Sequence, residues 1–158
     1  MKKFLKIKDF YFLVALLSIL SILSAVYIEK VLEAIPCKLC VYQRIPYIFS
    51  IFFCFLGYIY NKNLLWIYLL ITTFLFSFIL AGYHVGIENN LFPEFSGCKA
   101  DNLNILDKEK LLESLSKSIP NCKEITFKLF GLSLATINLF VSLFILCTSI
   151  IVIKNEKN

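Results

Sequence analysis

Two cysteines separated by two residues and followed by an arginine are the group in this sequence best suited to chemistry. Cys37 and Cys40 lie within the stretch Pro36–Tyr47, which reads PCKLCVYQRIPY. A Cys-x-x-Cys pair can close a small disulfide ring or hold two thiols ready for exchange. Arg44 follows Cys40 by four residues, so in a helix the two side chains would lie on one face, one turn apart. The spacing therefore predicts a redox pair beside a fixed positive charge.

Four further cysteines complete the set of six. Cys54 and Cys147 lie inside apolar runs, so both are predicted to be small buried side chains. Cys98 and Cys122 lie in a long polar segment, 24 residues apart. With the first pair they make four cysteines that allow three disulfide pairings, and the spacing alone does not choose among them.

The composition indicates that membrane-spanning helices position these residues. Hydrophobic residues make up 59% of the 158 residues and charged residues only 17%, a balance typical of a polytopic membrane protein. The length predicts a single integral membrane domain, residues 1–158. The net charge of +5 does not indicate nucleic-acid binding, because many of the lysines flank apolar runs and no basic stripe with interleaved aromatic residues occurs.

Four apolar runs are long enough to cross a bilayer as helices. They are predicted at about 10–28, 41–60, 64–83 and 129–153, with loops at about 29–40 and 84–128. The N-terminus, the turn at Lys62 and the C-terminal tail are each net positive, whereas residues 84–128 hold six lysines and seven carboxylates. Because lysines collect on the cytoplasmic side, both termini are predicted to be cytoplasmic and both loops extracytoplasmic. The expected fold is an all-α membrane protein, a four-transmembrane-helix bundle.

A short amphipathic helix is predicted within the long loop, at residues 107–119. Its apolar residues fall on one face, Asp107 is a candidate N-cap, and Pro120 would end it. Two interpretations stay open, a helix lying on the membrane surface and a helix packed against the loop itself.

Redox chemistry is favoured over a structural role for Cys37 and Cys40. A disulfide between them closes a loop too short to contribute much chain entropy, and a helix start favours the thiolate. A zinc site is not favoured, because Cys98 and Cys122 lack a zinc-knuckle spacing, and no metal is predicted. Two cysteine pairs on one side of a membrane, where disulfides persist, instead indicate a relay by thiol–disulfide exchange.

Such a relay needs a terminal electron acceptor. The sequence has no Gly-rich nucleotide fingerprint, no haem-type Cys-x-x-Cys-His and no iron–sulfur spacing, so a membrane quinone fits best. Arg44 could polarise a quinone oxygen, or it could only anchor the end of the span. His84, the one histidine, follows the third predicted span. It could bond the other quinone oxygen or shuttle a proton, although a lone interfacial histidine is more often an anchor.

The stretch around Cys37 resembles the signature of the disulfide bond formation protein B (DsbB) family, bacterial inner-membrane thiol oxidases. The resemblance covers most of the chain. It includes the four spans, the segment 83–88 leading to Cys98, and the segment 130–133 that follows Cys122 and enters the last span.

This resemblance implies a route for electrons and a location. The long-loop disulfide, here Cys98–Cys122, would oxidise a soluble thioredoxin-fold partner of the DsbA type on the periplasmic side of the inner membrane. Cys98 matches the cysteine that forms the mixed disulfide with the partner. Cys122 matches the one that then pairs with the first loop, here with Cys37.

The resemblance also implies a quinone site. Cys40 matches the thiolate that contacts ubiquinone or menaquinone, and Arg44 matches the neighbouring arginine. His84 matches a histidine near the quinone. The expected activity is that of a thiol:quinone oxidoreductase that supports disulfide bond formation.

Two rival interpretations remain. A vitamin K epoxide reductase-like enzyme is also a four-helix quinone–thiol bundle, but its quinone-side Cys-x-x-Cys follows the loop cysteines, whereas here it comes first. A structural or assembly membrane protein with two static disulfides would instead leave Arg44 as an anchor.

Overall fold

Four long helices dominate the computed structural model, which describes residues 6–60, 63–93, 122–123, 127–129 and 131–157. They are α1 (Ile7–Lys30), α3 (Ile45–Ile59), α4 (Leu65–Glu88) and α6 (Leu134–Lys157), and the short α2 (Lys38–Tyr42) precedes α3. With α2 and α3 counted as one span, Lys38–Ile59, four helical spans are long and apolar enough to cross a membrane. The predicted all-α membrane fold is confirmed. Cys98 and the helix predicted at 107–119 lie outside the described residues.

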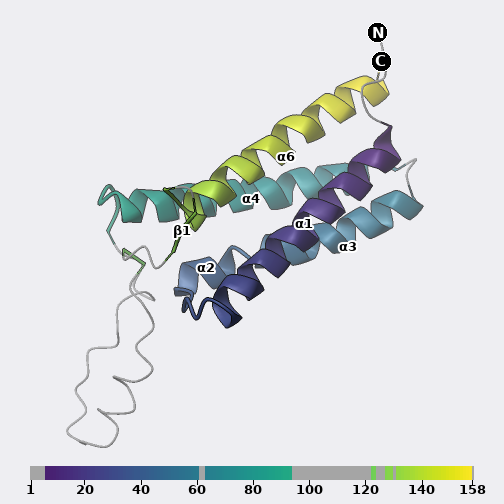
Figure 1. The fold of residues 1–158 in the computed structure, drawn as a ribbon. Helices are drawn as coiled ribbons and strands as arrows, with labels where there is room; N and C mark the ends of the chain where they lie inside the picture. The colour runs from purple at the N-terminus through teal and green to yellow at the C-terminus, as the bar shows by residue number, and fades with distance from the viewer. Residues whose placement is uncertain (1–5, 61–62, 94–121, 124–126, 130, 158) are drawn as a thin grey trace, which may run out of the picture.

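The helices pack as two antiparallel pairs, α1 with α3 and α4 with α6, and α3 also packs against α4 (Figure 1). The start of α1 and the end of α6 lie at one end of the bundle, and α2 lies near the other. Contacts between α1 and α6 are few. The bundle is therefore closed on three sides and loosely joined on the fourth, between α1 and α6.

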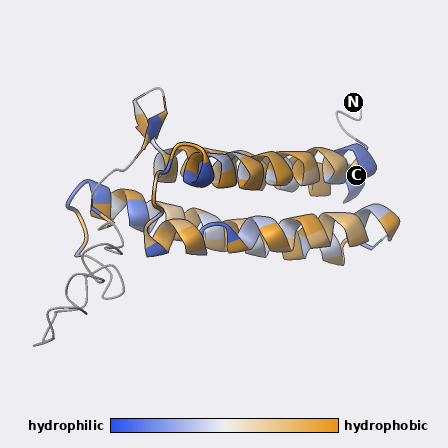
Figure 2. Ribbon diagram, turned by 60° about the horizontal axis from the view of Figure 1, so that its bottom comes forward, coloured by the Kyte–Doolittle hydropathy of each residue, from blue (hydrophilic) through white to orange (hydrophobic). Residues whose placement is uncertain are grey.

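The outer surface is as apolar as the interior, as expected of helices surrounded by lipid. Figure 2 shows hydrophobic residues along the helices and hydrophilic ones mainly at their ends. Large apolar side chains such as Phe12, Phe55 and Phe76 are exposed. Inside the bundle, serine pairs join the helices: Ser18 and Ser50 Oγ lie 2.7 Å apart, and Ser77 and Ser142 Oγ lie 3.0 Å apart. Small polar side chains of this kind let spanning helices approach closely.

Gly57 on α3 packs against the Tyr11 ring on α1. A Cβ atom at this position would meet the Tyr11 ring at 2.6 Å, and Tyr11 is fully buried and unable to move aside. Gly57→Ala is expected to lower the free energy of unfolding by about 1–3 kcal/mol through overpacking. Gly82→Ala is the matched control, because its Cβ would meet only Leu139 Cδ1 at 3.7 Å. Equal stability of the two variants, measured by unfolding in detergent, would contradict this packing of α1 on α3.

The third helix is longer than predicted, because α4 continues through His84 to Glu88 rather than ending at residue 83. The fourth begins later, at Leu134 rather than residue 129. Before it, strand β1 (Lys128–Leu129) pairs antiparallel with β2 (Leu132–Ser133). Gly131 makes the turn with φ +83°, a conformation that favours glycine. A two-stranded hairpin thus precedes the last helix, where the sequence predicts helix alone.

Cysteines inside the spans are buried in one case and exposed in the other. Cys54 is 1% exposed, which confirms the prediction for it. Cys147 is exposed on α6, so the prediction of a buried side chain there is wrong. Because α6 is apolar on every face, the sequence does not say which of its small side chains point outward.

Helix α2 begins directly after the first cysteine and ends at Tyr42, two residues before Arg44. Cys37 is its N-cap, in an extended backbone conformation, and its Sγ accepts a hydrogen bond from the Cys40 N–H. Pro46 occupies the second position of α3. Because proline has no N–H to donate to the preceding turn, the helix breaks at Gln43 and Arg44.

Candidate functional site

The Cys-x-x-Cys pair lies at the start of the second span as two free thiols. The Sγ atoms of Cys37 and Cys40 are 2.9 Å apart in a hydrogen bond. The Cys40 N–H also donates to Cys37 Sγ at 3.3 Å. Cys37 is buried, with 4% of its surface exposed. The two sulfurs are close enough to exchange a proton or to form a disulfide with little movement.

His84 lies beside this pair, but within α4 rather than after it. It is buried, and its Nε2 lies 3.7 Å from Cys37 Sγ. Glu88, one turn later on the same helix, places a carboxylate oxygen 3.8 Å from the same nitrogen. Glu88 in turn accepts a hydrogen bond of 2.6 Å from the hydroxyl of Ser133, the last residue of β2. The structure therefore places His84 against the first cysteine.

Cys37 is outside the membrane-spanning segment, which begins at Lys38. The hydrogen bond with Cys40 and, against the opposing effect of burial, the nearby His84 ring lower the pKa of Cys37 from its ordinary 9.0 to about 4. Cys37 is therefore the more acidic thiol of the reduced pair. Since the folded pKa lies below the unfolded one, ionised Cys37 stabilises the reduced fold above about pH 9, and that contribution declines as the pH falls toward 4.

A pH titration of the reduced protein checks this shift. The ultraviolet absorbance of the thiolate, taken as the difference between the parent and Cys37→Ser, is expected to stay constant from about pH 8 to 6 and to fall with a midpoint near 4. Cys40→Ala removes the hydrogen bond that contributes most, so its midpoint is expected to rise. A parent midpoint near the value of an ordinary thiol, about 8.5, would contradict the geometry.

Cys122, from the C-terminal part of the long polar segment, also lies beside Cys37. It is 2% exposed and packs in a small buried cluster with Cys37, Leu39 and Ile87. Cys122 is disulfide-bonded, in contrast to Cys37 and Cys40. A disulfide and a thiolate thus share one cluster, which is the arrangement that thiol–disulfide exchange requires.

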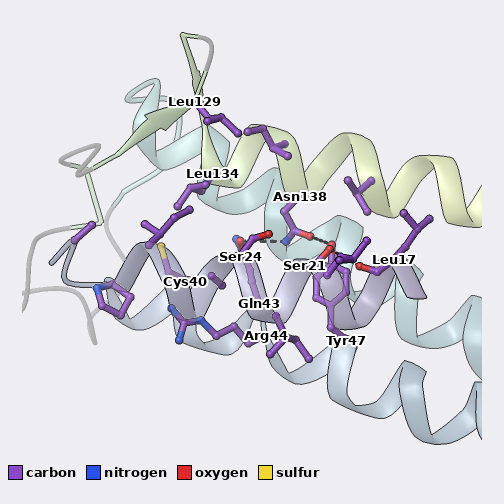
Figure 3. A pocket seen from close by; sticks show the side chains of 18 residues that line it. Leu17, Ser21, Ser24, Cys40, Gln43, Arg44, Tyr47, Leu129, Leu134 and Asn138 are labelled. Carbon is purple, nitrogen blue, oxygen red and sulfur yellow. Dashed lines mark hydrogen bonds between the residues drawn. The ribbon is translucent and has the colours of Figure 1, made fainter. Parts of the chain in front are cut away.

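A cavity of about 320 Å³ opens between α1, α6 and the start of the second span (Figure 3). Its walls are mainly aliphatic side chains of α1 and α6, among them Leu17 and Leu134. Cys40 and Arg44 both line it, as expected from their spacing, although the helix breaks between them. His84 is not among the lining residues. The cavity thus reaches the second cysteine of the pair.

Arg44 is held at this cavity by an ion pair. Its Nη1 lies 2.5 Å from Glu29 Oε2 at the end of α1, and about a quarter of each side chain is exposed. An exposed pair of this kind contributes only about 0–1 kcal/mol to stability. The ion pair therefore positions Arg44 at the cavity but adds little to the stability of the fold.

Three uncharged polar side chains for which the sequence predicts no role complete the cavity wall. The Asn138 amide donates to Gln43 Oε1 at 3.1 Å, and the Tyr47 hydroxyl donates to Asn138 Oδ1. All three side chains line the cavity. Gln43 also bonds His84 Nδ1 at 3.1 Å. The available signal was an amide side chain inside an apolar span, which in a membrane marks an interior position.

The ligating atoms of Cys37, Cys40 and His84 lie within 4.8 Å of one another, close enough to hold a metal ion. A tetrahedral zinc ion would keep two thiolate sulfurs ~3.7 Å apart. The observed 2.9 Å is shorter. The arrangement therefore fits a hydrogen-bonded thiol and thiolate better than two ligands of one ion.

The family model of the disulfide bond formation protein DsbB matches residues 7–152. The chain belongs to this family. It is therefore a membrane oxidoreductase of disulfide bond formation, and the expected family assignment is confirmed. The chain is also similar to "Uncharacterized protein RP370" of Rickettsia prowazekii (strain Madrid E), with 28% identity over 136 residues, covering 82% of this chain and 78% of that protein.

The DsbB assignment agrees with what the structure brings together. Cys37, Cys40 and Cys122 meet at one end of the bundle, and Arg44 lies with Cys40 at the cavity. Cys98, the remaining predicted site residue, lies outside the described residues.

Proposed function

We propose that this protein is a thiol:quinone oxidoreductase that reoxidises a periplasmic DsbA-type thioredoxin-fold protein and passes the electrons to a membrane quinone. It would sit in the bacterial inner membrane, with both cysteine pairs facing the periplasm and both termini in the cytoplasm. The observation that carries the proposal is the position of the reduced pair. Cys37 packs with the disulfide-bonded Cys122, and Cys40 lines an apolar cavity beside Arg44.

The lining of the cavity suits a quinone in its chemistry. Aliphatic walls suit an isoprenoid chain, and the few polar groups among them suit the carbonyl oxygens of a ring. A bound ubiquinone or menaquinone would accept two electrons and two protons and become a quinol. Arg44 would hold one ring oxygen and stabilise negative charge there, because its charge is fixed and its guanidinium donates several hydrogen bonds.

The cysteines would act in sequence. The reduced partner would attack the Cys98–Cys122 disulfide, with Cys98 forming the mixed disulfide, and leave as a disulfide. Cys122, now a thiolate, would attack Cys37 of an oxidised Cys37–Cys40 pair and release Cys40 as a thiolate at the cavity. Cys98, freed as a thiolate when the partner leaves, would then attack Cys122, restore the Cys98–Cys122 disulfide and release Cys37 as a thiolate.

The relay would then be restored at the first pair. Once Cys40 has taken a proton, the Cys37 thiolate would attack its sulfur, a Cys37–Cys40 disulfide would form, and the quinone held in the cavity would receive the two electrons. The Cys40 proton and one more from solution would balance the formation of the quinol.

Thiol trapping in cells separates this proposal from a structural protein with two static disulfides. A relay leaves a mixture of redox states that shifts toward reduced cysteines when quinone supply falls. Static bridges would stay fully oxidised under both conditions. If the distribution of trapped redox states did not change with quinone supply, the proposal would be wrong.

A further inference from the structure

A continuous chain of hydrogen-bonding side chains runs from the cavity wall to the first cysteine. The Tyr47 hydroxyl donates to Asn138 Oδ1, and Asn138 Nδ2 donates to Gln43 Oε1 at 3.1 Å (Figure 3). Gln43 Nε2 lies 3.1 Å from His84 Nδ1, and His84 Nε2 lies 3.7 Å from Cys37 Sγ. This series of hydrogen bonds joins side chains of α3, α6, the break before α3, and α4.

Asn138 gives this hydrogen-bonded chain its direction. Its Oδ1 accepts from the Tyr47 hydroxyl and from the Ser142 hydroxyl at 3.4 Å. Its amide nitrogen donates to Gln43 Oε1. The NH₂ group of Gln43 then faces His84, and an amide nitrogen can only donate.

The histidine end supports the same direction. With the Gln43 NH₂ group opposite Nδ1, a proton on Nδ1 would set two donors against each other. On the other side of the ring, Nε2 faces Cys37 Sγ at 3.7 Å and a Glu88 carboxylate oxygen at 3.8 Å. Both are acceptors when ionised. Nδ1 therefore faces a hydrogen-bond donor, whereas Nε2 faces two groups that accept when ionised.

We propose that Gln43 and Asn138 are positioning residues that hold His84 in the tautomer with its proton on Nε2, directed at Cys37 Sγ. The histidine then stabilises the Cys37 thiolate as a donor and does not act there as a base. This role deepens the proposed thiol oxidation at the same site and rests on it. The tautomer itself can be measured without quinone or partner.

The sequence offers a direct test, because His84 is its one histidine. In reduced protein labelled with ¹⁵N-histidine, nuclear magnetic resonance reports the protonation of both ring nitrogens of a single residue. The parent is expected to show the Nε2–H tautomer in about tenfold excess, the ratio that one neutral hydrogen bond of roughly 1–1.5 kcal/mol supports. A proton on Nδ1 in the parent would overturn the proposal.

Two variants are expected to reverse the hydrogen bond at His84 Nδ1 by different routes. Gln43→Glu sets a carboxylate opposite Nδ1, and Asn138→Asp accepts from the Gln43 NH₂ group and so turns the Gln43 oxygen toward Nδ1. Each is expected to put a proton on Nδ1. Thr148→Val is the matched control on α6, since the Thr148 hydroxyl bonds only backbone carbonyls of its own helix.

The two variants keep the test decisive if one does not fold. If Nδ1 stayed unprotonated in every folded variant, Gln43 and Asn138 would not set the tautomer of His84. Loss of quinone reduction in all proteins, with the tautomers as expected, would instead count against the proposed function alone.

Discussion

Replacing Cys40 by serine is expected to abolish quinone reduction, with a loss of at least ~1,000-fold in rate. Cys40 is the cysteine of the pair that lines the cavity. A serine hydroxyl neither ionises near neutral pH nor forms a disulfide with Cys37, so electrons have no path from the pair to the cavity. The measurement is the loss of quinone absorbance in the presence of a reduced DsbA-type partner.

Cys147→Ser is the matched control for this experiment. Cys147 is also a free cysteine in a spanning helix, but it is exposed on α6 and does not line the cavity. This variant is expected to keep the parent rate. Equal rates in Cys40→Ser and Cys147→Ser would remove Cys40 from the reaction.

Replacing Arg44 by glutamine is expected to slow quinone reduction about 100-fold, the cost of removing one charged donor from a site where negative charge develops. Arg44 lines the cavity with Cys40. Arg44→Lys keeps the charge but loses the planar fork of donors, so its rate is expected to lie between those of the parent and of Arg44→Gln. Steady-state rates at varied quinone concentration measure the effect.

Glu29→Gln tests whether Arg44 stabilises charge at the cavity or only anchors the end of the span. It breaks the same ion pair from the other side but leaves the arginine charge at the cavity. Its stability is expected to change by less than about 1 kcal/mol and its rate by less than about fivefold. If Glu29→Gln and Arg44→Gln slowed the reaction equally, the ion pair itself would matter and Arg44 would be an anchor.

The spans and the reactive cysteines could be predicted because their signals are local. A bilayer demands about 20 consecutive apolar residues, so run length alone locates four helices. The Cys-x-x-Cys spacing and Arg44 one turn later are likewise contained in a single short stretch. Cys40 and Arg44 do share the cavity, even though Pro46 breaks the helix near them.

The contacts between helices could not be predicted. Because α4 and α6 are apolar on all faces, no hydrophobic stripe fixes their rotation about their own axes. The sequence therefore does not show that His84 faces Cys37 or that Asn138 faces Gln43. The extension of α4 to Glu88 has a similar cause, since the bond from Ser133 to Glu88 joins residues 45 positions apart.

The central claim is tested most directly by quinone reduction in the purified parent protein. The protein, kept with its lipid, is mixed with reduced DsbA-type partner and with ubiquinone or menaquinone, and quinone absorbance is followed. The account predicts steady loss of quinone with one oxidised partner formed for each quinol. No loss with either quinone, from a partner shown to be reduced, would contradict it.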